Sequence, residues 1–169
     1  MTIHGIGGLG HLAVQYASRM GFRTVALSRG EDKRKLAEEL GAHEFIDTAK
    51  NNVVEVLGKL GGADLILATA PSGKAISGLL PGLSKRGKLL MVAAASDPVE
   101  VGAFNMLSGK SIQGWPSGSA IDSEDTMNFS ALTGVKPKTE TFPLEKANEA
   151  FAKMMENQVR FRAVLTMKS

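Results

Sequence analysis

Three glycines near the start of the chain have the spacing that could hold phosphate groups. Gly5, Gly7 and Gly10 follow the pattern GxGxxG, which binds a dinucleotide where it joins a strand to the first turn of a helix. There the first glycine permits a tight bend, the second lets a pyrophosphate approach the backbone, and the third lets the helix pack on the strand. The N–H groups of the loop, including those of Gly8 and Leu9, would bind the phosphates at the positive end of the helix dipole. A glycine-rich turn that binds no ligand is the alternative interpretation.

The residues after the second predicted strand indicate which dinucleotide would bind. Units specific for NAD place an Asp or Glu about 20 residues past the glycines, where it binds the ribose 2′-OH. Ser28 stands at that position here, followed by Arg29 and then by Lys33. A hydroxyl, a guanidinium and an ammonium group suit the 2′-phosphate of NADP, so we predict NADP(H) as the cofactor. In the alternative, Arg29 and Lys33 are only the solvated end of a helix and Glu31 binds a ribose of NAD.

The composition excludes several classes of site. The chain of 169 residues has no cysteine and only three histidines, His4, His11 and His43. No two histidines have the spacing of a zinc-binding pair, so we predict no metal site. His11, in the first turn of the helix after the glycines, is expected to face solvent or to lie behind the loop rather than to contact phosphate. The formal net charge is +3, with basic and acidic residues interleaved, which argues against a nucleic-acid partner.

The sequence also gives no sign of a membrane partner. No apolar run approaches the roughly 18–20 residues that span a bilayer. The first residues lack the basic start and apolar stretch of a secretory signal. Together with the lack of cysteine, this favours a cytoplasmic location.

Short apolar runs alternate with amphipathic segments along the first two-thirds of the chain. A stripe at helical spacing consists of Leu9, Leu12, Ala13, Tyr16, Ala17 and Met20. Predicted strands at 2–4, 22–27, 44–47, 64–70 and 88–95 alternate with predicted helices at 9–20, 31–40, 53–60 and 73–83. Strands that are apolar on both faces and alternate with helices indicate a parallel sheet covered on both sides. The predicted fold class is α/β, a Rossmann-type doubly wound parallel sheet with helices on both faces.

The composition changes after about residue 119. We predict a dinucleotide-binding domain over 1–118, with a truncated first strand, and a C-terminal helix and strand tail over 119–169. The tail is expected to contain helices at 122–132 and 143–156, an extended segment at 138–142 and a final strand at 161–167. The buried stripe of its second helix would consist of Ala147, Ala150, Phe151 and Met154.

Five stretches, in order along the chain, resemble a known family: GIGGLGHLAVQYA, KRKLAEELGA, ADLILATA, LSKRGKLLMVAAAS and KSIQGWPSGSAIDSEDT. They are similar to the coenzyme-binding half of zinc-dependent medium-chain alcohol dehydrogenases, especially of the NADP-linked branch that includes cinnamyl alcohol dehydrogenases. The resemblance implies a six-stranded Rossmann domain whose tail packs back on a catalytic domain. In the family that catalytic domain precedes the glycine loop and carries the zinc ions.

The resemblance also implies further cofactor-binding residues. Ligands of open parallel sheets lie past the carboxyl ends of the strands, which points to Thr69, Ala70, Val92, Ala93, Ala94, Gly114, Trp115 and Ser117. Taken alone, Trp115 is better explained as a core or interface residue than as a ring that stacks on the cofactor. In the tail, Arg162 matches a family arginine that reaches back to the pyrophosphate. Arg160 is the fallback for that role, and an ordinary edge-strand residue is the alternative.

The activity that the resemblance implies is hydride transfer between nicotinamide and an alcohol or aldehyde, with zinc as a Lewis acid on the oxygen. The family's zinc ligands lie upstream of the glycine loop, so zinc is expected only in the missing catalytic domain, and no catalytic residue carries over to this chain. We therefore expect the chain to bind cofactor without oxidising alcohols by itself. Phe142, Val164 and Leu165, which would meet the catalytic domain, are expected to be exposed.

Other interpretations stay open. The chain could be a stand-alone module that senses a dinucleotide or binds a partner. A zinc-free, quinone-reductase-like enzyme fits the GIGGLGH and SEDT stretches less well, and S-adenosylmethionine is disfavoured because its ribose also requires an acid after the second strand. A second copy of the chain is an expected partner, through the sheet edge near Lys110–Trp115, where the family pairs strands across a dimer.

Overall fold

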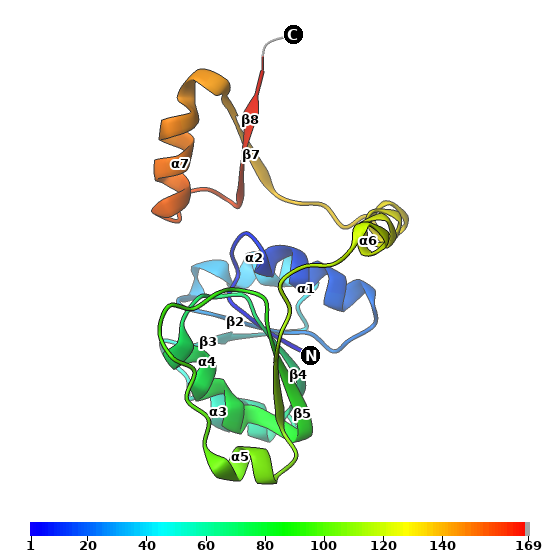
Figure 1. Ribbon diagram of the computed structural model, residues 1–169, viewed down its shortest axis with the longest axis vertical. Helices are drawn as coiled ribbons and strands as arrows, with labels where there is room; N and C mark the ends of the chain where they lie inside the picture. Colours follow the sequence, from blue (N-terminus) through cyan, green and yellow to red (C-terminus); the bar gives the residue numbers. More distant parts are fainter. Residues whose placement is uncertain (168–169) are drawn as a thin grey trace.

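The computed structural model describes residues 1–167 and contains a large and a small sheet (Figure 1). Six parallel strands form the large sheet in the order β3-β2-β1-β4-β5-β6, and β7 and β8 form a separate parallel pair. The strands are β1 (Thr2–His4), β2 (Val25–Ser28), β3 (Glu44–Asp47), β4 (Ala63–Ala68), β5 (Leu83–Met91), β6 (Ser111–Gly114), β7 (Thr139–Pro143) and β8 (Arg162–Thr166). The helices are α1 (Gly10–Arg19), α2 (Arg34–Glu39), α3 (Val53–Lys59), α4 (Gly73–Leu79), α5 (Ala103–Leu107), α6 (Ala120–Thr133) and α7 (Ala147–Met155).

Helices cover both faces of the large sheet, with α1 and α2 above the strands and α3 and α4 below them in Figure 1. On the α1 and α2 side, Ile3, Val14 and Phe45 belong to one buried apolar cluster. On the other side, Leu57 of α3 and Ile66 of β4 belong to a second cluster. Burying an aliphatic side chain of this size contributes roughly 1.5–3 kcal/mol. The Rossmann-type doubly wound fold predicted from the sequence is confirmed. Its strand order reverses between β1 and β4, the switch point where such sheets bind ligands.

Several strand boundaries differ from the predicted ones; β4 ends at Ala68 rather than at residue 70, for example, and β5 ends at Met91 rather than at residue 95. β5 begins at Leu83 rather than at residue 88, because Leu83 pairs with Ala63 across an irregular stretch in which Arg86 has a φ of 63°. β2 begins only at Val25, and Phe22 before it is 42% exposed. The short helix α5 was not predicted. These differences lie where strands begin or connect, so the pairing order of the sheet is unaffected.

Helix α1 is apolar on two faces, and only one of them is buried. Val14 and Ala17 pack into the core with 0% and 1% exposure. Leu9 and Met20, which belong to the predicted stripe, are instead 47% and 57% exposed. They line an open apolar groove over the same sheet face, together with residues such as Leu67 of β4. The stripe therefore identified the helix correctly, but part of it faces this groove rather than the core.

The tail has a small core of its own. Phe142, Ala150 and Val159 are buried together between α7 and the β7–β8 pair. Phe142 is only 8% exposed, so its predicted exposure is wrong, because α7 lies over that side of the strand pair. Val164 and Leu165 are 38% and 42% exposed, as predicted.

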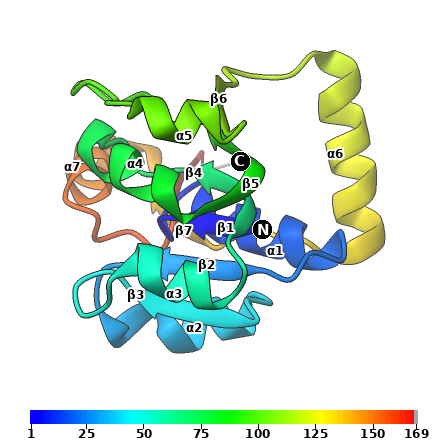
Figure 2. The same cartoon turned by 90° about the horizontal axis from the view of Figure 1, so that it is seen from below.

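The two longer tail helices expose much of their apolar surface. In α7, Ala150 is buried as predicted, whereas Phe151 and Met154 are 61% and 45% exposed, so the predicted stripe is wrong for these two. Helix α6 has no buried residue. One of its ends lies next to α1 (Figure 2), and a hydrogen bond of 2.7 Å joins Ser130 of α6 to the Tyr16 hydroxyl of α1. Within residues 1–167, no helix is long and apolar enough to cross a membrane.

Two histidines are held in the neutral form. The pKa of His4, in β1, lies below its ordinary value of 6.5 because burial disfavours the charged ring. His11 is fully buried, so the expectation that it faces solvent is wrong, and it lies behind the loop instead. Burial also lowers the pKa of His11, and the charges of Arg162 and Lys138 add to that effect, although a hydrogen bond to the Gly7 carbonyl opposes it.

We expect the free energy of unfolding to decrease as the pH is lowered below 6.5. The folded pKa values of His4 and His11 lie below 6.5, so in this range the unfolded chain binds more protons than the folded one. Their contribution to stability is complete above pH 6.5 and is lost progressively below it. Urea denaturation at a series of values between about pH 5 and pH 8 measures this dependence. A free energy that stays flat or rises on acidification over that range would contradict the prediction.

Candidate functional site

The glycine loop is held between the ends of three strands. The N–H of Gly5 donates a hydrogen bond of 2.9 Å to the carbonyl of Leu27 in β2. The hydroxyl of Thr69, directly after β4, lies 2.9 Å from the carbonyl oxygen of His4 and 3.1 Å from that of Gly5. Gly5 has a φ of 95°, a conformation that favours glycine. The loop is therefore fixed at the switch point of the sheet.

Helix α1 starts directly against this loop. A Cβ atom at Gly10 would overlap the carbonyl oxygen of Gly5 and come within 2.9 Å of the Thr69 hydroxyl, so the close packing requires glycine at this position. Gly7 is different, because a Cβ atom there would meet no atom within 4 Å. The geometry thus gives Gly10 a packing role and leaves open space over Gly7.

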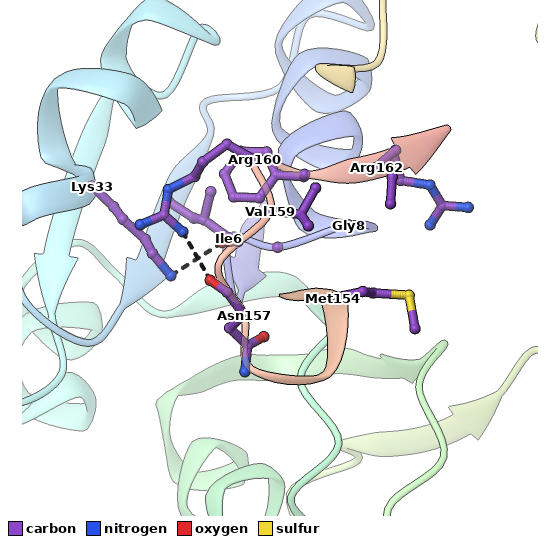
Figure 3. Close-up of a pocket in the computed structure, with 11 residues that line it drawn as sticks. Ile6, Gly8, Lys33, Met154, Asn157, Val159, Arg160 and Arg162 are labelled. Carbon is purple, nitrogen blue, oxygen red and sulfur yellow. Dashed lines mark hydrogen bonds between the residues drawn. The ribbon is translucent and has the colours of Figure 1, made fainter. Parts of the chain in front are cut away.

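Two adjoining cavities lie over the loop. The first has a volume of about 360 Å³ and is lined by His4, Gly5, Ile6, Gly7, Gly8, Leu27, Ser28, Arg29, Lys33, Thr48, Thr69, Ala70, Pro71 and Asn157. The second, of about 270 Å³, is lined by Ile6, Gly7, Gly8, Lys33, Met154, Asn157, Val159, Arg160, Phe161, Arg162 and Ala163 (Figure 3). Both cavities are lined by part of the loop and also by Lys33 and Asn157. We therefore treat them as one cleft between the large sheet and the tail.

The cleft is strongly basic. Its four cationic residues are Arg29, Lys33, Arg160 and Arg162. The ammonium group of Lys33 donates to the carbonyl of Ile6 at 3.3 Å, one of the contacts drawn as dashed lines in Figure 3. The guanidinium of Arg162 lies beside Gly8, where an added Cβ atom would be 3.2 Å from Nη1. No Asp or Glu is among the residues of 1–167 that line either cavity. The cleft therefore favours anions.

The cleft brings together most of the predicted residues near the glycines. Its lining includes Gly5, Gly7, Gly8, Ser28, Arg29, Lys33, Thr69, Ala70 and Arg162. Gly10 lies behind the loop in the packing contact, and Leu9 faces the apolar groove. The other predicted residues that line neither cavity are Val92, Ala93, Ala94, Gly114, Trp115 and Ser117. Of these, Val92 and Trp115 line an apolar hollow between α1, the sheet and α6, and Trp115 is 52% exposed.

Several lining residues escaped the sequence prediction. Thr48 and Pro71 follow β3 and the loop after β4, so the strand-end rule that pointed to Thr69 would have found them. Arg160, the fallback for Arg162, lies on the Lys33 side of the cleft in Figure 3, with its guanidinium 3.5 Å from the carbonyl oxygen of Asn157. Asn157 had no such signal, because only the three-dimensional return of the tail brings it to the loop.

The acidic groups near the end of β2 are already engaged. Asp47 pairs with Ser28 in the sheet register, and its Oδ1 accepts hydrogen bonds from the N–H groups of Gly30 (2.8 Å) and Ala49 (2.9 Å). These bonds hold the pKa of Asp47 below its usual range. Glu31 accepts hydrogen bonds of 2.6 Å and 3.2 Å from Arg34, which lower the pKa of that carboxyl. Neither carboxylate lines the cleft.

The described residues do not fit a zinc ion. No group of three or more His, Cys, Asp or Glu side chains within residues 1–167 is arranged to hold a metal. The chain also contains no cysteine. Metal chemistry is therefore not assigned to any residue of this chain.

Comparison with known proteins identifies the family. Residues 8–132 match the family model of zinc-binding dehydrogenases. Over 168 residues the chain is 52% identical to an alcohol dehydrogenase of Penicillium expansum, and the match covers 99% of this chain and 49% of that protein. An alcohol dehydrogenase of Geobacillus stearothermophilus is 34% identical over 170 residues, which cover 99% of this chain and 50% of the relative. The solved structure of a cinnamyl alcohol dehydrogenase of Sorghum bicolor matches with a TM-score of 0.85 at 30% identity, over 97% of this chain and 46% of that one.

The chain spans about half the length of the curated relatives it matches. With its glycine loop at the switch point of a six-stranded parallel sheet, it belongs to the zinc-binding dehydrogenase family and corresponds to the C-terminal portion of the alcohol dehydrogenases in that family.

Proposed function

We propose that this chain is the NADP(H)-binding part of an oxidoreductase that acts on an alcohol or aldehyde. The observation that carries the proposal is the cleft itself, in which, among residues 1–167, a glycine loop with open space over Gly7 meets four cations and no lining carboxylate. A bound nicotinamide would supply or accept a hydride. The residues of this chain bind and orient that cofactor, and the division into a binding domain over 1–118 and a tail over 119–169 belongs to the same proposal.

The loop suits the diphosphate of a dinucleotide. Its backbone around Gly7 and Gly8 is accessible from both cavities, and α1 begins immediately after it, so the positive end of the helix faces the cleft. Arg162 beside Gly8 adds a guanidinium from the tail side. A diphosphate in this position would receive backbone N–H groups from below and a fork of donors from above.

The end of β2 supports NADP over NAD. Ser28 and Arg29 line the first cavity, where an NAD-specific unit would offer a carboxylate to the ribose. Glu31, the acid of the alternative, is exposed and paired with Arg34. A 2′-phosphate carries negative charge, so Arg29 and Lys33 attract it electrostatically, whereas an unmodified ribose offers them no charge.

The activity of the full-length relatives requires more than this chain offers. The chain covers about half of each relative, and the part described has no side-chain cluster suited to zinc. We therefore infer that the chain alone binds the cofactor without turning over a substrate. Its lack of cysteine supports a reducing, cytoplasmic compartment as part of the same proposal. A stand-alone dinucleotide sensor is the second candidate, and it shares the binding step.

The exposed strand β6 supports association of two copies. It forms one edge of the large sheet, and within residues 1–167 it pairs only with β5. Its unpaired backbone groups can extend the sheet into a second copy of the chain near Lys110–Trp115.

A Gly7→Ala substitution should weaken cofactor binding without unfolding the chain. The added methyl group meets no protein atom within 4 Å, but it occupies the space that a pyrophosphate needs. We expect an unchanged melting temperature and an affinity for NADPH at least about tenfold weaker. Gly10→Ala is the matched control, because its methyl group collides with the Gly5 carbonyl and should lower the melting temperature. Wild-type affinity in a folded Gly7→Ala chain would argue against the proposed site.

The purified chain should bind NADPH more tightly than NADH, by roughly tenfold, through charge-assisted hydrogen bonds to the 2′-phosphate. Arg29→Asp should abolish that preference, because it replaces the guanidinium with a carboxylate. Lys85→Asp makes the same change of charge at an exposed position at the other end of the sheet and should keep the preference. Titration calorimetry with both cofactors measures the three ratios of NADPH affinity to NADH affinity, one for each protein. Equal or reversed wild-type affinities would contradict the choice of NADP.

The purified chain should not oxidise NADPH in the presence of aldehydes, because no residue described here can polarise the carbonyl oxygen through a metal. Absorbance of NADPH, followed with a panel of aromatic and aliphatic aldehydes, tests this expectation. Turnover that persists after treatment with a chelator would show that the chain is catalytic by itself.

A further inference from the structure

We infer that His11 is a positioning residue of the cofactor site: its imidazole ties the glycine loop to the main chain of Lys138, and through Lys138 it holds Arg162 over the loop. The inference rests on the proposed cofactor binding and extends it to a residue that does not line the cleft. No motif of the dinucleotide fingerprint requires a histidine at this position.

The ring of His11 has two partners far apart in the sequence. Its Nδ1 lies 2.8 Å from the carbonyl oxygen of Gly7 in the loop. Its Nε2 accepts a hydrogen bond of 3.0 Å from the backbone N–H of Lys138, between α6 and β7. The ring also stacks on Phe161 with 4.7 Å between centroids. The imidazole is 0% exposed, so none of these contacts competes with bulk water.

The backbone of Lys138, which His11 holds, is in turn hydrogen-bonded to the backbone of Arg162. The carbonyl of Lys138 accepts hydrogen bonds from the N–H groups of Phe161 (3.0 Å) and Arg162 (3.1 Å). A continuous path therefore runs from the Gly7 carbonyl through His11 and Lys138 to the backbone of Arg162. The guanidinium of Arg162 lies beside Gly8, one residue from the start of that path.

The two partners fix the proton on the ring. A carbonyl oxygen can only accept, so Nδ1 must carry hydrogen, and a backbone N–H can only donate, so Nε2 must be bare. His11 is therefore a neutral imidazole that links the loop to Lys138 through one donor, Nδ1, and one acceptor, Nε2. The groups with charge that face it are Arg162 and Lys138, and neither can replace the acceptor that Lys138 N–H requires.

A pair of amide substitutions distinguishes the hydrogen bond of His11 to Gly7 from its hydrogen bond to Lys138. In His11→Asn the amide overlaps the Nδ1 position and keeps a donor for Gly7, but it does not reach Lys138. In His11→Gln the longer side chain brings its carbonyl oxygen near the Nε2 position, where it can accept from Lys138. Affinity for NADPH is measured for both by calorimetry, with circular dichroism and melting curves as a check of folding. We expect about tenfold weaker binding for His11→Asn and recovery to within about twofold for His11→Gln.

A double-mutant cycle tests the route through Arg162. Arg162→Ala alone should weaken NADPH binding by about tenfold. Adding His11→Asn to that variant should weaken the binding little further, because the guanidinium that His11 positions is already gone. Equal losses for His11→Asn and His11→Gln, no loss for His11→Asn, or fully additive losses with Arg162→Ala would each overturn the inference. If the wild-type chain bound neither NADPH nor NADH, the proposed function itself would fail, and this inference with it.

The wild-type chain gives a measurement that needs no variant. ¹⁵N spectra of labelled histidine distinguish a ring protonated at Nδ1 from one protonated at Nε2 or at both nitrogens. At neutral pH we expect Nδ1 of His11 to be protonated and Nε2 to be a bare acceptor. The opposite tautomer or a charged ring would overturn the inference even if the Asn variant failed to fold.

Discussion

The contact between Gly5 and Gly10 is the constraint on which the site depends. Helix α1 approaches the end of β1 so closely that a single methyl group at Gly10 would overlap the Gly5 carbonyl. This approach puts the first turn of α1, and with it the positive end of the helix, against the switch point of the sheet. The Thr69 hydroxyl, within reach of two loop carbonyls, ties the same place to β4. A loop held so firmly can offer its backbone to an anion without the entropic cost of ordering it first.

The local sequence pattern was enough to predict the short strands and the alternation of strands and helices. β1 and β3 begin and end where the sequence placed them, and in each of them apolar residues lie between polar ones. The alternation of strands and helices was enough to infer the parallel sheet, since only a crossover helix can return the chain to the same edge. The beginning of β5 could not be predicted in this way, because it depends on the irregular pairing of Leu83 with Ala63. Such pairing is a property of two strands rather than of one.

Side-chain environments were harder to predict, because amphipathic segments in this chain have more than one apolar face. Phe142 was predicted to be exposed and Phe151 to be buried, yet the first is covered by α7 and the second is 61% exposed. Leu9 and Met20 looked like core residues, yet they line an open groove. Periodicity shows which residues share a face of a helix. It does not show whether a neighbouring element lies against that face.

The site is likewise divided between what spacing could reveal and what only the folded chain brings together. Ser28, Arg29 and Lys33 are close to the glycines in space because β2 is the neighbour of β1, as the fold class requires. Arg160, Asn157 and Arg162 reach the same cleft from the other end of the chain. No spacing within the chain predicts that return, and only the family resemblance pointed to Arg162, with Arg160 as the fallback. The tail is therefore not an appendage of the sheet as far as binding is concerned. It supplies two of the four cations of the cleft, and contacts of Gln15 and His11 of α1 with residues 136, 138 and 161 hold it in place. A ligand that bridges the loop and the tail would in turn stabilise their packing, because it binds only the arrangement in which both are present.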